Sequence, residues 1–187
     1  MDLLFKNAQC VTPEGVKKLS LKVENGIISK MAEDLFESNN DKVVDLEGKF
    51  LLPGIIDSQV HLRWPGLDHK EDLETGSRAA VAGGVTTFLE MPNTPPPTTD
   101  EESLTVKVNQ GHSVSRANFG FFMGATAENL EVLKTAHEIP GCVGIKIFLG
   151  SSTGPLLLNQ PDKLKEIFNS VKLPIAIHSE NENMLRE

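Results

Sequence analysis

The feature that most constrains the fold is the alternation of short apolar segments with helical ones after Pro53. Apolar runs of strand length recur along this part of the chain, and segments with the helical period separate them. Such alternation builds βαβ units, and therefore predicts a parallel sheet. The expected strands are 55–61, 85–91, 119–123, 143–149 and 175–179, and the expected helices are 70–82, one opening at 99–102, 127–138 and 161–171.

Local signals set the expected helix ends. Gly83 and Gly84 follow the first helix, where a helix end favours a residue with positive φ. Thr99 and Glu102 have the spacing of a capping box, which predicts the start of the second helix after the Pro-rich loop 92–98. Pro161 is a favourable first-turn residue for the last helix.

Two architectures contain five parallel strands with helices between them. One is a doubly wound open sheet, and the other is the first part of an eight-stranded βα barrel. A complete barrel takes about 250 residues, whereas 135 residues remain from Pro53 onward in this chain of 187. Periodicity does not choose between them, and the length mildly favours the open sheet.

Residues 1–52 have a different pattern, without a helical period. Leu19, Leu21 and Val23 alternate with polar residues, and Asn25-Gly26 then precedes another apolar run. Asn-Gly between such runs predicts a tight hairpin, because both turn residues need positive φ. With further strands expected at 3–11 and 43–46, this part is predicted to be a small antiparallel unit.

Composition limits the classes of partner and compartment. With 18 basic and 26 acidic residues the net charge is −8, which argues against nucleic acid or an anionic membrane as a partner. Two cysteines are too few for a disulfide framework. The first residues lack the pattern of a signal peptide, and no apolar stretch reaches membrane-spanning length. A soluble, cytoplasmic protein is therefore expected.

Polar side chains at the carboxyl ends of the expected strands are the candidate functional residues. His61 and Gln59 share one side of the first strand, and Arg63 follows. A single His at a strand end is more often structural than a metal ligand, and a surface Arg is the simplest interpretation of Arg63. Asn93 follows the second strand, where a rigid Pro-rich turn is the alternative to a binding role.

Lys146 and His178 are the candidates on the fourth and fifth strands. Lys146 is the only charge in an apolar strand, where burial is costly unless the amine is paired or chemically used. Burial lowers the pKa of a lysine and favours the neutral amine, although the side chain could also extend to the strand end. His178 ends the fifth strand, and histidine is a frequent metal ligand.

The combined motifs resemble those of the dihydroorotases in the amidohydrolase superfamily. The resemblance extends over essentially the whole chain and rests on motifs that occur in the family's order. They are Pro53-Gly54-Ile55-Ile56-Asp57, Val60-His61-Leu62-Arg63 with Pro65-Gly66, His69-Lys70-Glu71-Asp72-Leu73-Glu74, Glu90-Met91-Pro92-Asn93-Thr94 and the segment from Lys146 to Gly154.

The resemblance implies an amidohydrolase-type TIM barrel that is incomplete here, over 53–187, with residues 1–52 forming part of a small β-sandwich. It implies the reversible cyclisation of N-carbamoyl-L-aspartate to dihydroorotate, in pyrimidine biosynthesis. His61, Lys146 and His178 would bind one or two zinc ions, with Lys146 carboxylated. Arg63 and Asn93 would bind the substrate carboxylate.

Two departures from the family pattern affect this expectation. Gln59 replaces the first His of the strand-one His-x-His motif, and an amide oxygen is a poorer zinc ligand than an imidazole. Trp64 stands where the family usually has an acidic residue. The family's strand-six His and its catalytic Asp, on strand eight, have no counterpart before Glu187, so no catalytic residue is assigned within this chain.

Three interpretations follow from these residues. The first is a dihydroorotase-like enzyme, present as an amino-terminal part. The second is another cyclic amidohydrolase, of the allantoinase or hydantoinase type. The third is a non-catalytic dihydroorotase-like paralogue that acts as an assembly partner, which Gln59 suits but Lys146 and His178 do not. The expected partners are a small-molecule substrate and, through open sheet edges, a second copy or another chain.

Overall fold

The computed structural model describes residues 2–150, 154–181 and 184. Ser151, Ser152 and Thr153, part of the last motif quoted above, lie outside the described residues. The chain divides into two compact units, Met1–Pro53 and Gly54–Glu187, which we call unit 1 and unit 2.

Unit 1 is one sheet with strand order β3-β2-β1-β4, in which β5 also pairs with β1. Its hairpin turns at Asn25 and Gly26, whose φ values of 52° and 78° confirm the predicted turn. The prediction of an all-antiparallel unit is wrong, because β4 and β5 run parallel to β1. The strands are β1 (Asp2–Thr12), β2 (Gly15–Glu24), β3 (Ile27–Ala32), β4 (Asp41–Asp45) and β5 (Phe50–Leu51).

Unit 2 contains a parallel sheet whose strands are ordered as they occur in the chain, β10-β9-β8-β7-β6. A doubly wound sheet reverses its strand order at a switch point, whereas a barrel adds each strand beside the one before. The observed order is that of an incomplete barrel, so the open sheet favoured by chain length is wrong. The strands are β6 (Ile55–Val60), β7 (Val85–Glu90), β8 (Asn118–Gly124), β9 (Cys142–Phe148) and β10 (Ile175–His178).

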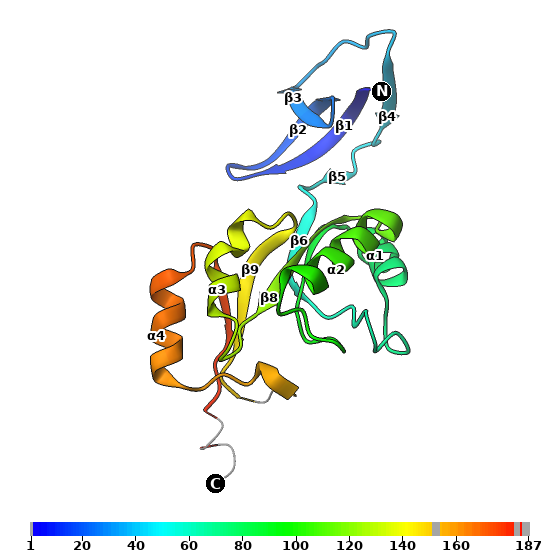
Figure 1. Ribbon diagram of the computed structural model, residues 1–187. Helices are drawn as coiled ribbons and strands as arrows, with labels where there is room; N and C mark the ends of the chain where they lie inside the picture. The colour runs from blue at the N-terminus through cyan, green and yellow to red at the C-terminus, as the bar shows by residue number, and fades with distance from the viewer. Residues whose placement is uncertain (1, 151–153, 182–183, 185–187) are drawn as a thin grey trace. The chain divides into compact units, whose positions relative to one another are not determined.

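The helices of unit 2 cover one face of this sheet (Figure 1), as right-handed crossovers between neighbouring strands require. Their apolar residues share one core with the strands; its buried members include Leu73, Leu104, Leu133, Ile167, Phe88, Phe121, Met123, Ile145 and Ile147. The helices are α1 (Leu73–Ala82), α2 (Glu101–Val114), α3 (Leu130–Thr135) with the 3-10 turn η1 (Ala136–Glu138), and α4 (Pro161–Ser170); a further 3-10 turn, η2, spans Gly154–Leu156.

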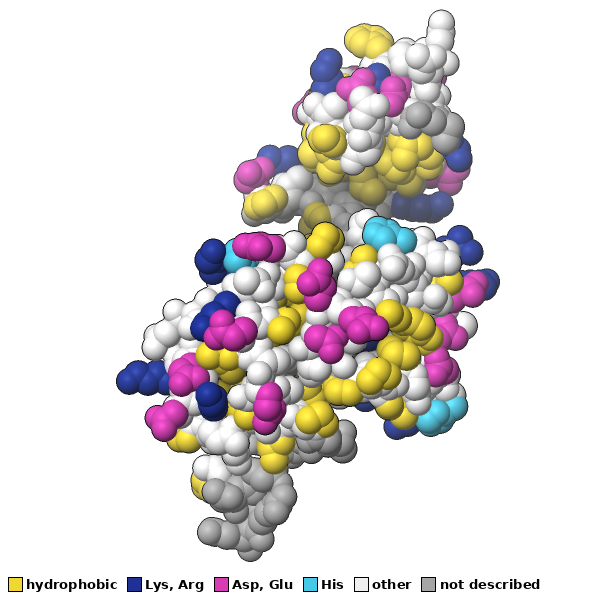
Figure 2. All heavy atoms as spheres, in the orientation of Figure 1, with side chains coloured by type: hydrophobic (Ala, Val, Ile, Leu, Met, Phe, Trp, Pro, Cys, Tyr) yellow, Lys and Arg dark blue, Asp and Glu magenta, His cyan; other side chains and the backbone are white. Residues whose placement is uncertain are grey.

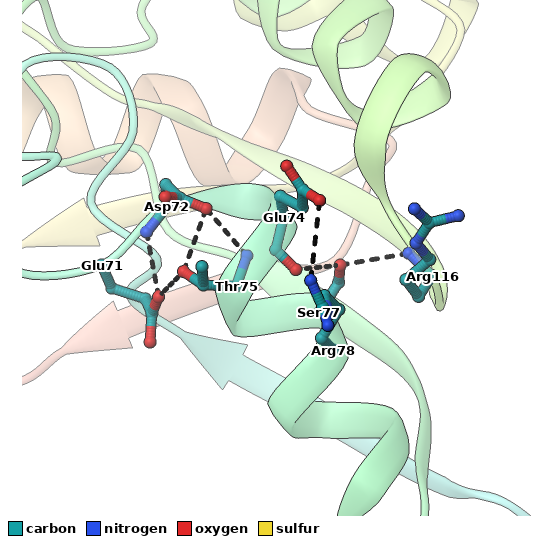
Figure 3. Close-up of polar contacts among 7 residues, drawn as sticks. All are labelled: Glu71, Asp72, Glu74, Thr75, Ser77, Arg78 and Arg116. Atoms are coloured by element: carbon teal, nitrogen blue, oxygen red, sulfur yellow. Dashed lines mark hydrogen bonds and ion pairs between the residues drawn. The ribbon is translucent and has the colours of Figure 1, made fainter.

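Helix α1 begins later than predicted, because Asp72 rather than Lys70 ends the preceding loop. The Asp72 side chain accepts a hydrogen bond from the Thr75 backbone N–H at 2.8 Å and is the N-cap (Figure 3). One turn on, the buried Ser77 hydroxyl donates to the Glu74 carbonyl at 3.0 Å and accepts from the Arg116 backbone N–H at 3.1 Å. Ser77 thereby joins α1 to the segment that enters β8.

The other helix starts also differ from the sequence prediction. The capping box of α2 is formed by Asp100 and Ser103 instead of Thr99 and Glu102, since the Asp100 carboxylate accepts from the Ser103 N–H at 2.8 Å. Helix α3 begins at Leu130, three residues after the predicted start. The Asn129 side chain accepts from the Thr126 N–H at 2.9 Å, which holds the preceding residues in a loop.

The surface of unit 2 carries acidic side chains interspersed with basic ones on the face shown in Figure 2. Among the described residues, no helix has the length and apolarity that crossing a bilayer requires.

Both outer strands of unit 2, β6 and β10, have an unpaired edge among the described residues. They also expose apolar side chains, with Ile56 65% and Ile177 39% accessible. Unpaired strand edges with apolar side chains are templates for pairing between chains. We therefore expect the isolated chain to self-associate.

Sedimentation velocity at several protein concentrations tests this expectation. Lysine at Ile56 and Ile177 should shift the chain toward monomer, because a charge on an edge strand opposes pairing. Val106→Lys places the same charge on an exposed position of α2 and should leave association unchanged. A wild-type chain that stays monomeric throughout would contradict the prediction.

Candidate metal and substrate site

The candidate residues lie at the carboxyl edge of the parallel sheet. His61 follows the last residue of β6, Asn93 lies three residues after β7, and His178 is the last residue of β10. Lys146 lies near the end of β9, between two residues that pack into the helical core. In a βα barrel this edge is where active sites form.

His61 is partly buried, and the groups that shift its pKa identify the residues around it. Burial lowers its pKa most, followed by the positive charge of Arg63, with smaller contributions from Lys146 and Lys107, while the Asn93 side chain acts in the opposite direction. The structure therefore brings His61, Arg63, Asn93 and Lys146 into one neighbourhood. Nδ1 of His61 is buried and makes no hydrogen bond of good geometry with the described residues.

Arg63 has left-handed backbone geometry, with φ of 65°. That conformation costs a non-glycine residue on the order of 1 kcal/mol, so surrounding contacts must hold it. The Arg63 carbonyl accepts a hydrogen bond from the Leu67 N–H at 3.1 Å, which closes a turn directly after β6. The turn keeps the guanidinium beside His61.

Asn93 lies in the Pro-rich loop after β7. The loop is held by other residues, since the Pro92 carbonyl accepts from the Thr94 and Thr98 N–H groups at 2.9 and 3.0 Å. Oδ1 of Asn93 is buried without a well-formed hydrogen bond to the described part of the chain. Asn93 also lines a cavity of about 310 Å³ with Leu67 and Leu156. Its side chain is thus not used to build the turn.

Lys146 is buried, with 2% of its surface exposed, and does not extend to solvent. Its neighbours Ile145 and Ile147 belong to the helical core, so the alternation of β9 directs Lys146 to the opposite face. Nζ lies 5.0 Å from the centroid of the Phe148 ring. Burial lowers the pKa of Lys146, and no charged group of the described residues counters this effect. The neutral amine is therefore favoured relative to an exposed lysine.

His178 lies opposite Phe148 in the β9–β10 register, and the two rings stack with centroids 6.0 Å apart. Its Nε2 is 3.1 Å from Oε2 of Glu180, and 38% of the side chain is exposed. Lys146 and His178 thus contact the same Phe148 ring. The structure places both at this edge.

Sequence reasoning missed the buried ion pair between Glu90 and Lys107. Nζ of Lys107, on α2, is 2.9 Å from Oε2 of Glu90, and the side chains are 1% and 0% exposed. Burial raises the pKa of Glu90 and lowers that of Lys107, and each charge opposes the shift of the other. A signal was present, because Lys107 lies on the apolar face of α2 with Leu104, Val108 and Gly111.

The donor types fit a zinc site in part. Within residues 2–150, 154–181 and 184, no group of three or more His, Cys, Asp or Glu side chains is arranged to hold a metal. Lysine is not one of these four residue types, but its side chain becomes an oxygen ligand once it is carboxylated. Nδ1 of His61, which makes no hydrogen bond of good geometry, and the amine of Lys146, which has no charged partner among the described residues, suit an imidazole–carbamate donor set.

Comparison with known proteins gives a consistent answer. Residues 48–138 match the family described as dihydro-orotase-like. The dihydroorotase of Methanosarcina acetivorans is 36% identical over 189 residues, which cover all of this chain and 40% of that protein. The allantoinase of Deinococcus radiodurans is 37% identical over 153 residues, 81% of this chain and 34% of its own length.

A solved structure of an L-hydantoinase (dihydropyrimidinase) from Arthrobacter aurescens superposes with a TM-score of 0.90 at 29% identity, covering 99% of this chain and 42% of that one. The chain matches the amino-terminal part of the cyclic amidohydrolases. It spans 34–42% of the length of these relatives. Unit 2 accordingly has the fold of the first part of an amidohydrolase-type TIM barrel.

Proposed function

We propose that the chain supplies part of the active site of a metal-dependent cyclic amidohydrolase with dihydroorotase activity. The observation that carries this proposal is the buried Lys146, without a charged partner among the described residues, in the same neighbourhood as His61, Arg63 and Asn93. Burying a lysine amine in this state costs free energy that no charged partner among the described residues offsets. A chemical use accounts for the burial, because a neutral amine takes up carbon dioxide and releases a proton to become a carbamate.

His61, carboxylated Lys146 and His178 are the proposed ligands of one or two zinc ions. Bound zinc lowers the pKa of a coordinated water toward neutrality and polarises a carbonyl under attack. The apolar surroundings of Lys146 disfavour its carbamate anion until a cation compensates the charge. Carboxylation and metal binding are therefore expected to depend on each other.

Arg63 and Asn93 are proposed to bind the substrate's carboxylate. A guanidinium donates two parallel hydrogen bonds to a carboxylate, and an amide adds a further donor. This pair favours a substrate with a carboxylate beside the reacting amide. In the reversible cyclisation of N-carbamoyl-L-aspartate to dihydroorotate, both the open-chain and the cyclic compound carry that carboxylate. No acid–base Asp of the family is assigned within the chain, so the chain by itself is expected to have negligible turnover.

The second candidate activity is that of an allantoinase or hydantoinase. It is favoured by relatives with those names whose similarity to the chain is comparable. The test is a chimera in which the remaining part of the Methanosarcina acetivorans dihydroorotase follows residue 187. Turnover of dihydroorotate but neither allantoin nor hydantoin supports the first proposal, and the reverse supports the second. A metal-loaded chimera inactive on all three would favour a non-catalytic assembly partner.

Gln59→His is expected to tighten zinc binding in this chimera and to raise its turnover. Imidazole is a stronger zinc ligand than a neutral amide oxygen, so the first metal position gains a donor. Zinc titration against a chelating indicator measures the affinity of both proteins. Gln9→His places an imidazole in unit 1, on β1, and should leave the affinity unchanged. Equal zinc affinity of the chimera with and without the Gln59→His substitution would remove Gln59 from the metal site.

The cytoplasm is the proposed compartment. The two cysteines, Cys10 and Cys142, are both free thiols, and Cys10 is buried in unit 1. Pyrimidine synthesis would also supply the proposed substrate there.

A further inference from the structure

The ion pair of Glu90 and Lys107 lies next to the segments that lead to Arg63 and Asn93. Glu90 is the last residue of β7, and Lys107 reaches it from the second turn of α2. Both side chains are fully buried, and Nζ also lies 5.6 Å from the centroid of the Phe121 ring. Neither residue is among the proposed metal or substrate ligands.

Each member of the pair contacts the backbone of one loop. The Arg63 backbone N–H lies beside the Glu90 carboxylate and favours its charged form, and the two buried carboxylate oxygens make no hydrogen bond of good geometry with any described residue. Nζ of Lys107 donates to the Met91 carbonyl at 3.4 Å, two residues before Asn93. The Met91 N–H in turn donates to the Val60 carbonyl at 3.0 Å, which joins the ends of β6 and β7.

Stability alone does not account for this arrangement. A buried ion pair contributes little net stability compared with an apolar pair of the same volume, because both charges lose their hydration. An apolar pair at these positions would make neither backbone contact. It would leave the left-handed Arg63 and the Met91 carbonyl without those partners.

We propose that the buried Glu90–Lys107 pair positions Arg63 and Asn93 relative to each other by holding the backbone of both loops. Glu90 holds the turn at Arg63, and Lys107 holds the segment that leads to Asn93. This role rests on the proposed function only in naming a carboxylate as the group that Arg63 and Asn93 bind. Glu90 and Lys107 are positioning residues.

The test compares the double variant Glu90→Gln/Lys107→Met with wild type, in the full chain. Removing both charges avoids an uncompensated buried charge, so the fold is retained while both backbone contacts are weakened or lost. We expect amide hydrogen exchange at Arg63 and Thr94 to accelerate by about tenfold or more, because local opening becomes easier there. The amides of Gly83 and Ser115, bonded at the ends of α1 and α2, should keep their rates.

The matched control is Glu131→Gln/Lys134→Met, which removes an exposed ion pair of 2.6 Å on α3. It should change exchange at neither loop. Glu90→Asp provides a second variant that keeps both charges but shortens the reach to Arg63. Its expected effect is faster exchange at Arg63 with Thr94 unchanged.

Succinate, a simple dicarboxylate, serves as the binding probe. Wild type should bind it at least about tenfold more tightly than the double variant, since two side chains held in place lose less freedom on binding. Wild-type exchange rates at Arg63 and Thr94 in the double variant, or a uniform acceleration at all four amides, would overturn the proposal. Failure of wild type to bind succinate would count against the proposed carboxylate site, and the exchange data would still decide the positioning role.

Discussion

Replacing Lys146 with alanine is expected to lower kcat/KM of the completed barrel by at least about 100-fold, the upper range for loss of a residue that only supports a metal ligand. Lys146→Arg should have the same effect, since a guanidinium stays charged and cannot form a carbamate. Activity assays together with zinc analysis by atomic emission measure both consequences.

Rescue experiments separate a metal-bridging role from a structural one. Short carboxylic acids added to the Lys146→Ala protein should restore part of its activity, because they supply oxygen ligands where the carbamate was. Lys165→Ala, at an exposed position of α4, is the control and should retain full activity. A Lys146→Arg protein with normal zinc content and normal rate would show that Lys146 is structural, and the proposed metal site would then be wrong.

Lys107→Met is expected to lower the free energy of unfolding by about 3–5 kcal/mol at neutral pH. The substitution leaves the Glu90 carboxylate buried without its counter-charge, which is the costly way to break such a pair. Urea unfolding followed by circular dichroism measures the loss. Lys134→Met removes the exposed cation of a surface pair and should cost less than about 1 kcal/mol.

The pH dependence of that loss has a definite sign. Burial raises the pKa of Glu90, so the folded state binds a proton more readily than the unfolded state. Stability from this group is present at low pH and is lost as the pH rises through its folded-state pKa. Without Lys107 that pKa rises further, and the cost of Lys107→Met should therefore be smaller at acidic than at alkaline pH. A cost independent of pH would mean that Glu90 is not the group left unpaired.

The strands of unit 2 were predictable from sequence because buried parallel strands are short, nearly continuous apolar runs. The expected strands 55–61 and 175–179 end within one residue of β6 and β10. The order of the strands in the sheet was less predictable, because local periodicity contains no information on strand order. The resemblance of the motifs to those of the dihydroorotases indicated the barrel. Helix starts were the weakest point, because Thr99 and Asp100 both head a plausible capping pattern and only the hydrogen bond of Asp100 distinguishes them.

A candidate residue was predictable where its polarity differs from that of the helix or strand that carries it. Lys146 is a charge inside an apolar strand, and the structure buries it as that pattern indicates. Lys107 was missed because lysine is common on helices and is normally solvated. Its ion-pair partner Glu90 was missed for a similar reason, because a charged residue at the end of a strand is normally solvated. Their pairing joins positions 17 residues apart, and no local period reports such a contact.

Proteins are synthesised from the amino terminus, and domains fold as they emerge. In the described sheet of unit 2, each strand is bonded to the strand made just before it, so every new βα unit finds its partner already in place. The strand made first, β6, keeps its outer edge open throughout translation. Its pairing with β7 is irregular at Ile55/Ile56 and again between Asp57 and Val60. These irregularities lie on the edge that faces β7, so the outer edge of β6, with the exposed Ile56, stays a template for foreign strands while the later strands of unit 2 are being made.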